Sequence, residues 1–566
     1  MSDSKEGGFQ MEKTAIMRWI IAGAILAGGS PVMAASPIPT FDKEAATVSP
    51  YMRKGRQDIA VSEPGKVDVW KPGNTGTAEA PAFYVRRIKL TGDAIPNHDG
   101  ELDTLLGKYT KRSLAPEELQ ALTADLDDYC RRAGLPLAQA VIPPQEVIFG
   151  TLEVRMYVAK LDEVKVTKNT SDVADSVIAG FARQMKSGET ITDHRLDTVI
   201  NNINDLPGVI ARTVLRPGRE PGTTSADIEV MRRATWNSYV FADNGGGYYS
   251  GRYRYGINAE INNPGHQGDK LVVSGMISNK DTKNYSVRYE TPAGYRGTRL
   301  GVAWSQSNYE LHTNDWYDSL GESKGFSFYG LTPVWRDKIN RLTAIYGYDY
   351  RRIEDKLRFR PWQIGNEIIQ LADNKTDKTA NVFHIGLSGS QYYPNEFLQY
   401  SLIYWYGDMD WKYSGAREGS HYHKLTGDLL KIWYDGKWNY RVNLSGQMAS
   451  THLDGSEQFF LGGMNGVRAY GNGDGYGDIG YLASGEIRWQ TKEPGLELAA
   501  FIDNGAVKER GGPLDHLSGW GLGLRYELPN DWYARFDWAR KINARPDRAE
   551  PDDHDSRLWF QVYRMF

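Results

Sequence analysis

From about residue 234 onward, apolar and polar residues alternate with a period of two. In 532–541 one face carries Trp532, Ala534, Phe536 and Trp538, and the other carries Tyr533, Arg535, Asp537 and Ala539. Segments 251–261 and 481–490 alternate in the same way. This period predicts β-strands. Charges on one face and aromatic residues near the ends of the other are typical of strands between lipid and a wet lumen.

The number and length of these segments favour a membrane barrel over a soluble β-sandwich. Sandwich strands usually have about 5–6 residues, whereas these have about ten. We count eleven candidate strands between Trp236 and Ala449 and five more after a glycine-rich loop, sixteen in all. An even strand number is usual in outer-membrane barrels. The predicted fold over residues 234–566 is therefore an all-β transmembrane barrel of 16 antiparallel strands.

Two small α/β units precede the barrel, over residues 83–158 and 159–233. In the first, a helix opens at Pro116 between a strand at 83–90 and two strands at 137–142 and 151–158. The apolar face of this helix consists of Leu119, Leu122, Leu126 and Tyr129. The second unit repeats the order, with a strand at 161–168, helices at 172–185 and 194–203, and strands at 208–218 and 225–233. A tandem repeat is stronger evidence than either copy alone.

The N-terminus has the pattern of a secretory signal peptide. Lys13 and Arg18 precede an apolar run from Trp19 to Gly29, and Val32-Met33-Ala34 offers a small-residue cleavage site. The run is too short to span a membrane as a helix, which needs about 20 apolar residues. We expect residues 1–34 to be a signal peptide and residues 35–82 to be a linker with one short helix around 43–56.

Composition excludes several functional classes. The net charge of −4 gives no reason to expect a nucleic-acid partner. The 34 tyrosines, 16 tryptophans and 60 glycines suit strands, turns and aromatic girdles. Cys130 is the only cysteine, so an intrachain disulfide is excluded, and we expect a buried packing thiol.

The chain offers little for catalysis or cofactor binding. His421 and His423 form an H-x-H pair, but no third ligand is evident and residues 415–423 have the composition of a loop. We find no G-x-S-x-G elbow of a serine hydrolase. We therefore expect no metal, no cofactor and no enzymatic activity.

The glycine-rich loop at 462–478 holds seven glycines and a single basic residue, Arg468. A nucleotide cradle needs a helix after its glycines, and here both flanking segments are strand-like. An EF-hand also fails, because the required glutamate does not follow Asn472 and Asp474. These two kinds of site are therefore excluded.

If this hairpin folds into the lumen, its guanidinium loses water and needs a carboxylate. Strand parity in 495–505 turns Glu497, Phe501 and Asp503 toward the lumen, which makes Asp503 a candidate partner. Two alternatives remain open. Arg468 could be a solvent-exposed loop residue, and Asp503 could be one lining charge among many, including Glu486, Arg488, Arg525 and Arg535.

These segments resemble the motifs of the TpsB family of two-partner secretion transporters. The hairpin residues Val467, Arg468, Ala469 and Tyr470 resemble the family's VRG(Y/F) motif. Phe501, Asp503 and Gly505 in FIDNG are similar to its (F/G)xDxG motif. The IPPQ of 142–145 and the ADNGG…GD of 242–269 also resemble the family, and the resemblance extends from about Phe83 to Phe566.

The resemblance implies two POTRA-type domains before a sixteen-stranded barrel in the outer membrane of a Gram-negative-type bacterium. Residues 35–233 would then lie in the periplasm, with a plug helix within 35–82. A secreted, TpsA-like partner (an adhesin, haemolysin or contact-dependent toxin) would dock on the POTRA-type domains and cross the lumen of a monomeric barrel embedded in outer-membrane lipid. An exposed sheet edge could bind an extended partner by strand addition.

For the hairpin, the resemblance implies that Arg468 pairs with Asp503 inside the barrel. Ala469 departs from the family's usual glycine and would be strained if that position needs a positive φ. Two other functions remain as alternatives. One is a barrel-assembly insertase of the same superfamily, which usually has more repeats, and the other is a passive porin with a periplasmic binding module.

Overall fold

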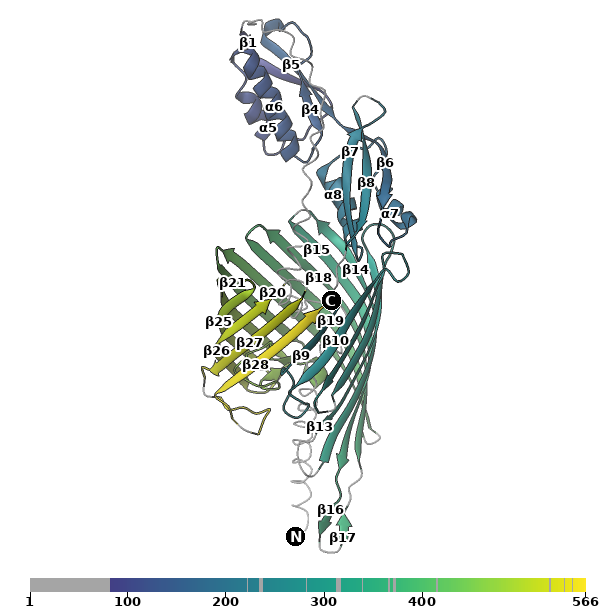
Figure 1. Cartoon of the computed structure of the whole chain (residues 1–566), viewed down its shortest axis with the longest axis vertical. Coiled ribbons are helices and arrows are strands. Elements are labelled where there is room, and N and C mark those ends of the chain that lie inside the picture. Colours follow the sequence, from purple (N-terminus) through teal and green to yellow (C-terminus); the bar gives the residue numbers. More distant parts are fainter. Residues whose placement is uncertain are drawn as a thin grey trace.

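The computed structural model describes residues 82–566, apart from short gaps. The gaps are 221, 234–237, 281, 312–316, 338, 365–366, 370–372, 414–415, 529–530, 544 and 552. Figure 1 shows two small α/β domains stacked on one rim of a large β-barrel. The expected signal peptide and the helix expected at 43–56 lie outside the described residues.

The first domain packs helix α6 against a three-stranded sheet. Its elements are β1 (Phe83–Val85), β2 (Arg87–Gly92), α5 (Glu101–Gly107), β3 (Arg112–Leu114), α6 (Pro116–Arg132), β4 (Ala138–Val141), the 3₁₀ turn η1 (Ile148–Gly150) and β5 (Thr151–Val158). Strand β5 lies between β2, which runs parallel to it, and β4, which runs antiparallel. Pro116 begins α6, and Gly134, at φ 83°, follows its end, as helix termini prefer.

The single strand expected at 83–90 is in fact two strands. The backbone bends at Arg86, whose N–H donates to the carbonyl of Gly150 at 2.7 Å. Before the bend β1 pairs with β3, and after it β2 pairs with β5. The apolar residues run across this bend, so the hydrophobic pattern could not show it.

The second domain repeats the topology of the first. Its elements are β6 (Lys160–Asn169), α7 (Asp175–Ala182), α8 (Asp193–Asn204), β7 (Val209–Pro217) and β8 (Thr223–Arg232). Strand β8 lies between the parallel β6 and the antiparallel β7. Helix α7 is shorter than the expected 172–185, because the side chain of Asn169 donates to the carbonyl of Val173 at 2.8 Å and Ala174 stays extended.

The barrel closes with sixteen antiparallel strands, as the sequence predicted. They are β9 (Tyr239–Asp243), β10 (Arg254–Asn262), β11 (Lys270–Ser278), β12 (Lys283–Pro292), β13 (Arg299–Leu311), β14 (Tyr317–Arg336), β15 (Asn340–Phe359), β18 (Asn374–Tyr393), β19 (Glu396–Tyr413), β20 (Ala416–Asp435), β21 (Trp438–Ala449), β24 (Ile479–Gln490), β25 (Leu496–Lys508), β26 (Leu514–Glu527), β27 (Trp532–Lys541) and β28 (Ser556–Met565). Strand β28 pairs with β9 to close the ring. Two shorter pairs, β16 (Trp362–Ile364) with β17 (Glu367–Ile369) and β22 (Phe459–Phe460) with β23 (Tyr476–Gly477), lie in loops.

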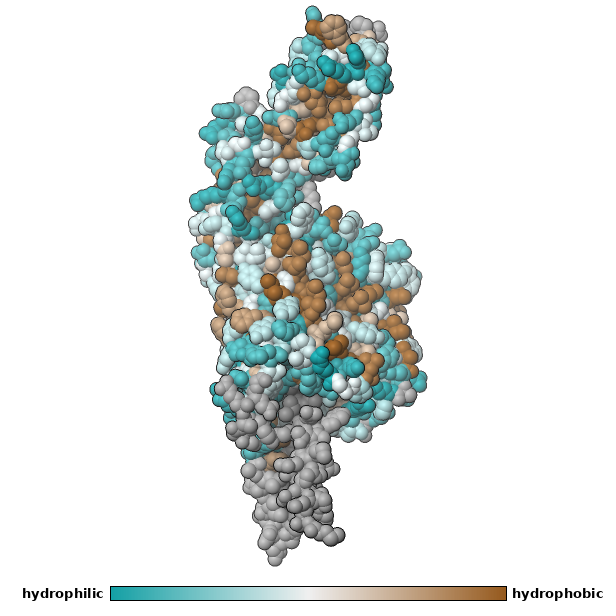
Figure 2. Space-filling model, turned by 180° about the vertical axis from the view of Figure 1, so that it is seen from behind, coloured by the Kyte–Doolittle hydropathy of each residue, from teal (hydrophilic) through white to brown (hydrophobic). Residues whose placement is uncertain are grey.

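The two faces of the barrel wall differ sharply in polarity. On β27, Trp532 and Phe536 are exposed on the outside, whereas Arg535 and Asp537 are buried inside. Figure 2 shows hydrophobic residues gathered across the outer wall. An apolar outer band with a polar interior is the surface of a barrel in lipid. Within the described part of the chain, we find no helix with the length and hydrophobicity to cross a membrane.

The second domain contacts the turns at the nearer rim of the barrel. Tyr295 packs edge-on against Phe181 on α7, with ring centroids 5.5 Å apart. A Cβ at Gly180 would overlap Tyr295, so this helix approaches closely only because a glycine is there. Arg336, at the end of β14, forms an ion pair with Asp205 after α8. Apolar and charged contacts together fix this domain on the rim.

The segment 415–423 was expected to be a loop, and this expectation was wrong. Residues 416–423 belong to β20, which pairs with β19. His421 lies 3.2 Å from a carboxylate oxygen of Asp408, and His423 shares a hydrogen bond with the Tyr404 hydroxyl. Cross-strand pairing therefore overrides the weak local propensity of this polar, glycine-containing stretch. No group of three metal-ligating side chains occurs among the residues that the structure describes.

The reactivity of the Cys130 thiol depends on the packing of the first domain. Its thiol is fully buried on α6, as expected, and burial raises its pKa to about 11.

We predict that a thiol reagent at pH 8 labels Cys130 of the folded chain slowly and that Leu126→Ala accelerates labelling. The buried Leu126 packs in the same core, and its truncation costs about 2–5 kcal/mol. Time-resolved labelling measures this. Asp128→Ala at an exposed position is the control, and equal rates in both variants would contradict the prediction.

Candidate functional site

The segment between β21 and β24 folds back into the barrel. Within it, Leu461 and the hairpin residues Val467, Ala469 and Tyr470 pack against the inner wall. Their wall partners are Leu482, Phe501, Val507, Leu517 and Ala539. The N–H of Val467 donates to the carbonyl of Leu461 at 2.7 Å, which closes the tip of the hairpin. The glycine-rich sequence thus forms a compact turn inside the lumen.

Arg468 lies at the tip of this hairpin and is 4% exposed. Its Nε and Nη2 donate to Oδ2 and Oδ1 of Asp503 at 2.8 and 2.9 Å, so the pair is bidentate. The backbone N–H of Arg468 also donates to Oδ2 of Asp503 at 3.1 Å. Ser484 joins the pair, accepting from Arg468 at 3.2 Å and donating to Asp503 at 2.7 Å. Every strong donor of this guanidinium therefore finds an acceptor on the wall.

Two more carboxylates complete the surroundings of Arg468. Its Nη1 lies 2.8 Å from Oε2 of Glu486 on β24 and 3.2 Å from Oδ2 of Asp537 on β27. Three wall arginines share these carboxylates. Arg488 and Arg525 contact Glu486, and Arg525 and Arg535 contact Asp537. We call Arg468, Asp503, Glu486, Asp537 and these three arginines the tip cluster, in which opposite charges alternate and so compensate one another.

The two other motif residues of the FIDNG segment, Phe501 and Gly505, fit the shape of the inserted segment. The ring of Phe501 lies under the Arg468 guanidinium, with 3.3 Å between the guanidinium carbon and the ring centroid. This arrangement adds a cation–π attraction in a water-poor site. A Cβ at Gly505 would lie 2.6 Å from the Leu461 side chain, so only glycine lets the hairpin sit against β25 here.

The remaining residues of the VRG(Y/F)-like segment are also buried. Ala469 is not among the residues with positive φ, so its backbone suits alanine, and its methyl group packs against Gly519, where a Cβ would be 2.5 Å away. The strain that the sequence raised for this position is therefore not present. The hydroxyl of Tyr470 donates to Oδ1 of Asn543 at 2.7 Å, in the loop between β27 and β28.

Several residues that hold the hairpin were missed by sequence reasoning. Asp537 accepts from Arg468, and the indole of Trp559 on β28 donates to the Arg468 carbonyl at 2.6 Å. Asp474 accepts two backbone N–H groups, from Arg548 and Ala549. Strand parity places Asp537 and Trp559 on the inner face, but parity alone does not say which inward residues face the hairpin.

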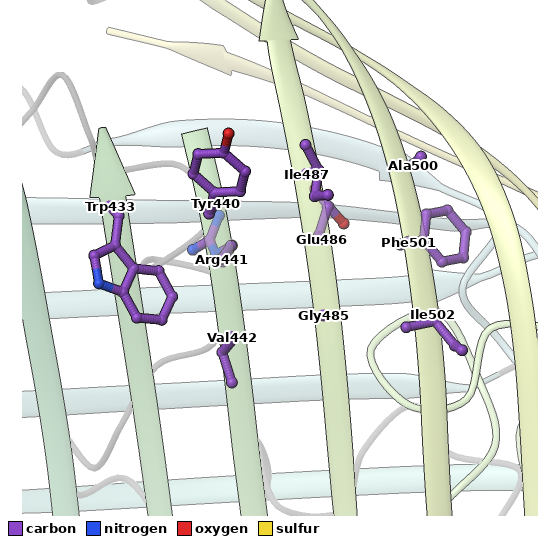
Figure 3. A pocket seen from close by; sticks show the side chains of 10 residues that line it. All are labelled: Trp433, Tyr440, Arg441, Val442, Gly485, Glu486, Ile487, Ala500, Phe501 and Ile502. Carbon is purple, nitrogen blue, oxygen red and sulfur yellow. The ribbon is translucent and has the colours of Figure 1, made fainter. Parts of the chain in front are cut away.

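A cavity of about 640 Å³ lies at the wall beside the tip cluster, and Figure 3 shows its lining residues. Val442, Ile487 and Ile502 belong to the outward set of β21, β24 and β25. Glu486 and Phe501 point inward and belong to the tip cluster and its stacking partner. The lining therefore includes residues from both faces of the wall, and we assign no ligand to the cavity.

Comparison with known proteins agrees with this architecture. The family model described as "Haemolysin secretion/activation protein ShlB/FhaC/HecB" matches residues 222–526. The chain belongs to this family. A second family model, "POTRA domain, ShlB-type", matches residues 83–157.

Relatives agree with this assignment, and a solved structure shares the fold. The heme/hemopexin transporter protein HuxB of Haemophilus influenzae strain 86-028NP is 25% identical over 406 residues, 69% of each chain. The outer membrane transporter CdiB of Dickeya dadantii is 21% identical over 432 residues, 73% of each chain. The structure of CdiB from Escherichia coli superposes with a TM-score of 0.66 at 18% identity, over 92% of this chain and 98% of that chain.

The protein is thus a two-partner secretion transporter, an outer-membrane β-barrel whose POTRA domains lie in the periplasm and which exports a partner protein. Its family is one of transporters. BamA from Haemophilus ducreyi lacking POTRA domains 1–3 has a TM-score of 0.50 at 13% identity, which shows a shared fold alone. The family match, and not this shared fold, favours the exporter over the insertase and porin alternatives.

We predict that Asp503→Asn exposes the hairpin to protease. The substitution keeps the shape of the side chain but removes its charge, and breaking a buried pair costs up to about 3–5 kcal/mol. Trypsin should cut after Arg468 slowly in the native chain and faster in the variant, as mass spectrometry of the fragments would measure. Asp555→Asn, at an exposed loop position, serves as the control. Equal cleavage in Asp503→Asn and the control would contradict the prediction.

Proposed function

We propose that Arg468 and Asp503 hold the hairpin in the resting lumen and that export requires the hairpin to move. The observation that carries the proposal is the burial of the Arg468 guanidinium on the inner wall, bidentate to Asp503. In this position the hairpin and its packed tip fill part of the lumen. A passing polypeptide needs that space, and charged contacts can be replaced by water when the hairpin leaves.

The proposed cargo is a large extended exoprotein of the adhesin, haemolysin or contact-dependent toxin type. The names of the relatives support a protein cargo of this kind. They are heme/hemopexin transporter protein, outer membrane transporter CdiB and hemolysin transporter protein. The first contact is made on the POTRA-type domains within 83–233. Each of their sheets has two outer strands, β2 and β4 in the first domain and β6 and β7 in the second. An extended partner strand can pair with such an edge through main-chain hydrogen bonds.

A secretion assay tests the role of the pair. The chain would be expressed with a large exoprotein of the proposed class, as wild type, Arg468→Ala, Asp503→Ala and the charge-swapped double variant. We expect both single variants to secrete much less than wild type and the swap to recover part of the loss, because it restores opposite charges at the same distance. Immunoblots of medium and outer membrane measure export and barrel insertion.

Arg352→Ala is the matched control, since Arg352 is exposed on the outward face of β15. Normal secretion by both single variants, with normal barrel insertion, would remove the proposed role of the pair while leaving the exporter assignment intact.

Site-specific photo-crosslinking tests the docking proposal. A photoreactive residue at Lys89 on β2 or Gln139 on β4 should crosslink to the exoprotein during export, since both side chains are exposed on the outer strands of the first sheet. Gln120 is exposed on α6 and serves as the control. Strong crosslinking only at Gln120 would move the docking surface from the sheet edges to the helix.

A further inference from the structure

A second group of buried charges lies at the start of the inserted segment, before the hairpin. Asp454 and Glu457 belong to residues 450–458, which lead from β21 to β22 and include a 3₁₀ turn, η2 (Gly455–Glu457). Glu457 lies 2.5 Å from Nη2 of Arg351 and 2.7 Å from Nζ of Lys424. Asp454 lies 3.0 Å from Nζ of Lys378. We call these five residues the root cluster.

The root cluster is buried almost as deeply as the tip cluster, with Asp454 partly buried. Lys378 is 2% exposed and Glu457 is 4% exposed. Lys378 also lies 3.0 Å from Asp355, which accepts from the Tyr309 hydroxyl at 2.8 Å. The indole of Trp411 donates to Asp454 at 3.4 Å. Ion pairs with this little exposure keep most of their strength, unlike surface pairs.

The two clusters lie on different parts of the wall. The cations of the root cluster come from β15, β18 and β20, whereas the wall residues of the tip cluster come from β24, β25, β26 and β27. These sets share no strand, and β21 separates them in the order of the barrel. The inserted segment is therefore held at two places around the circumference, each by its own charges.

The segment supplies the anions of the root cluster but the cation of the tip cluster. If the segment moved away, Arg351 and Lys424 would lose Glu457, and Lys378 would lose Asp454 while keeping Asp355. Leaving a buried charge without its partner is strongly unfavourable until water reaches it. The root cluster therefore opposes withdrawal of the segment, and it does so without any contribution from Arg468.

The root and the hairpin are also connected to each other. Oδ1 of Asp478, at the end of the hairpin, accepts from the N–H of Leu453 at 2.9 Å and from the side chain of Gln458 at 3.3 Å. The side chain of Gln447 on β21 donates to the carbonyl of Glu457 at 2.9 Å. Asp478 therefore joins the entry and the exit of the inserted segment, and displacement of residues 450–458 from the root cluster would also displace the hairpin.

We propose that Asp454 and Glu457 are positioning residues that keep the inserted segment in the resting lumen, as an anchor separate from the Arg468–Asp503 pair. This inference rests on the proposed function only in that the hairpin narrows the resting pore. The anchor acts through charge, so neutral residues of the same shape cannot replace it.

Conductance of the purified full-length chain in planar bilayers tests the proposal without using secretion. The double variant Asp454→Asn/Glu457→Gln should raise the open fraction about tenfold, which corresponds to 1.4 kcal/mol at 25 °C. Lys424→Met should also raise the open fraction, and Lys424→Arg, which keeps the charge, should not.

Adding Arg468→Ala to the double variant should increase the open fraction further, because the anchors are separate. Glu322→Gln on β14, outside the root cluster, is the control.

Folding of each variant is checked by its heat-dependent shift on a denaturing gel, which a barrel that fails to close does not show. An unchanged open fraction in the folded double variant and in Lys424→Met would overturn the proposal. Equal opening by Lys424→Arg and Lys424→Met would also overturn it, since shape rather than charge would then matter. If the pore opens as expected but Arg468→Ala alone secretes normally, the proposed role of the Arg468–Asp503 pair fails while the root anchor stands.

Discussion

The structure depends on the cost of placing a guanidinium inside the barrel. Arg468 is 4% exposed, and an ionised side chain in such a place is tolerated only with well-placed opposite charges and hydrogen bonds. Asp503 provides these in bidentate geometry, and Phe501 covers the face of the guanidinium. The alternation of charges on β24–β27 meets this requirement, and Gly505 leaves room for Leu461 beside the hairpin.

Charged contacts suit a segment that, as we propose, leaves its site during export. Apolar packing of Val467, Ala469 and Tyr470 also holds the hairpin, and withdrawal would expose this apolar surface to a wet lumen. Arg468 and the carboxylates of the wall can instead be rehydrated on both sides. The root cluster follows the same principle with the signs reversed, since the segment there supplies Asp454 and Glu457.

Much of the architecture could be predicted from the sequence, since it depends on periodicity. Alternation alone gave the sixteen strands and the inward parity of Asp503, and the helical spacing of Leu119 to Tyr129 gave α6. The family resemblance, rather than periodicity, paired Arg468 with Asp503. The bend at Arg86 could not be predicted, because it depends on Gly150, a partner distant in sequence. The shortened α7 depends on a side-chain hydrogen bond from Asn169 to Val173, and the strand at 416–423 depends on pairing with β19, neither of which periodicity shows. Asp537 and Trp559 were missed because parity gives a face but not a neighbour across the lumen. Asp454 and Glu457 were missed because they lie at a 3₁₀ turn, to which strand parity does not apply.

The most direct test of the account is the distance between the hairpin tip and the barrel, measured by pulsed electron paramagnetic resonance. Spin labels would be placed at Asn465 in the hairpin and at Lys492 in the turn between β24 and β25, both exposed, in a chain whose Cys130 is replaced by alanine. The account predicts one narrow distance distribution for this chain and a broad or shifted one after Asp503→Ala. A narrow, unchanged distribution in the Asp503→Ala variant would contradict it, because the hairpin would then stay in place without its buried charge pair.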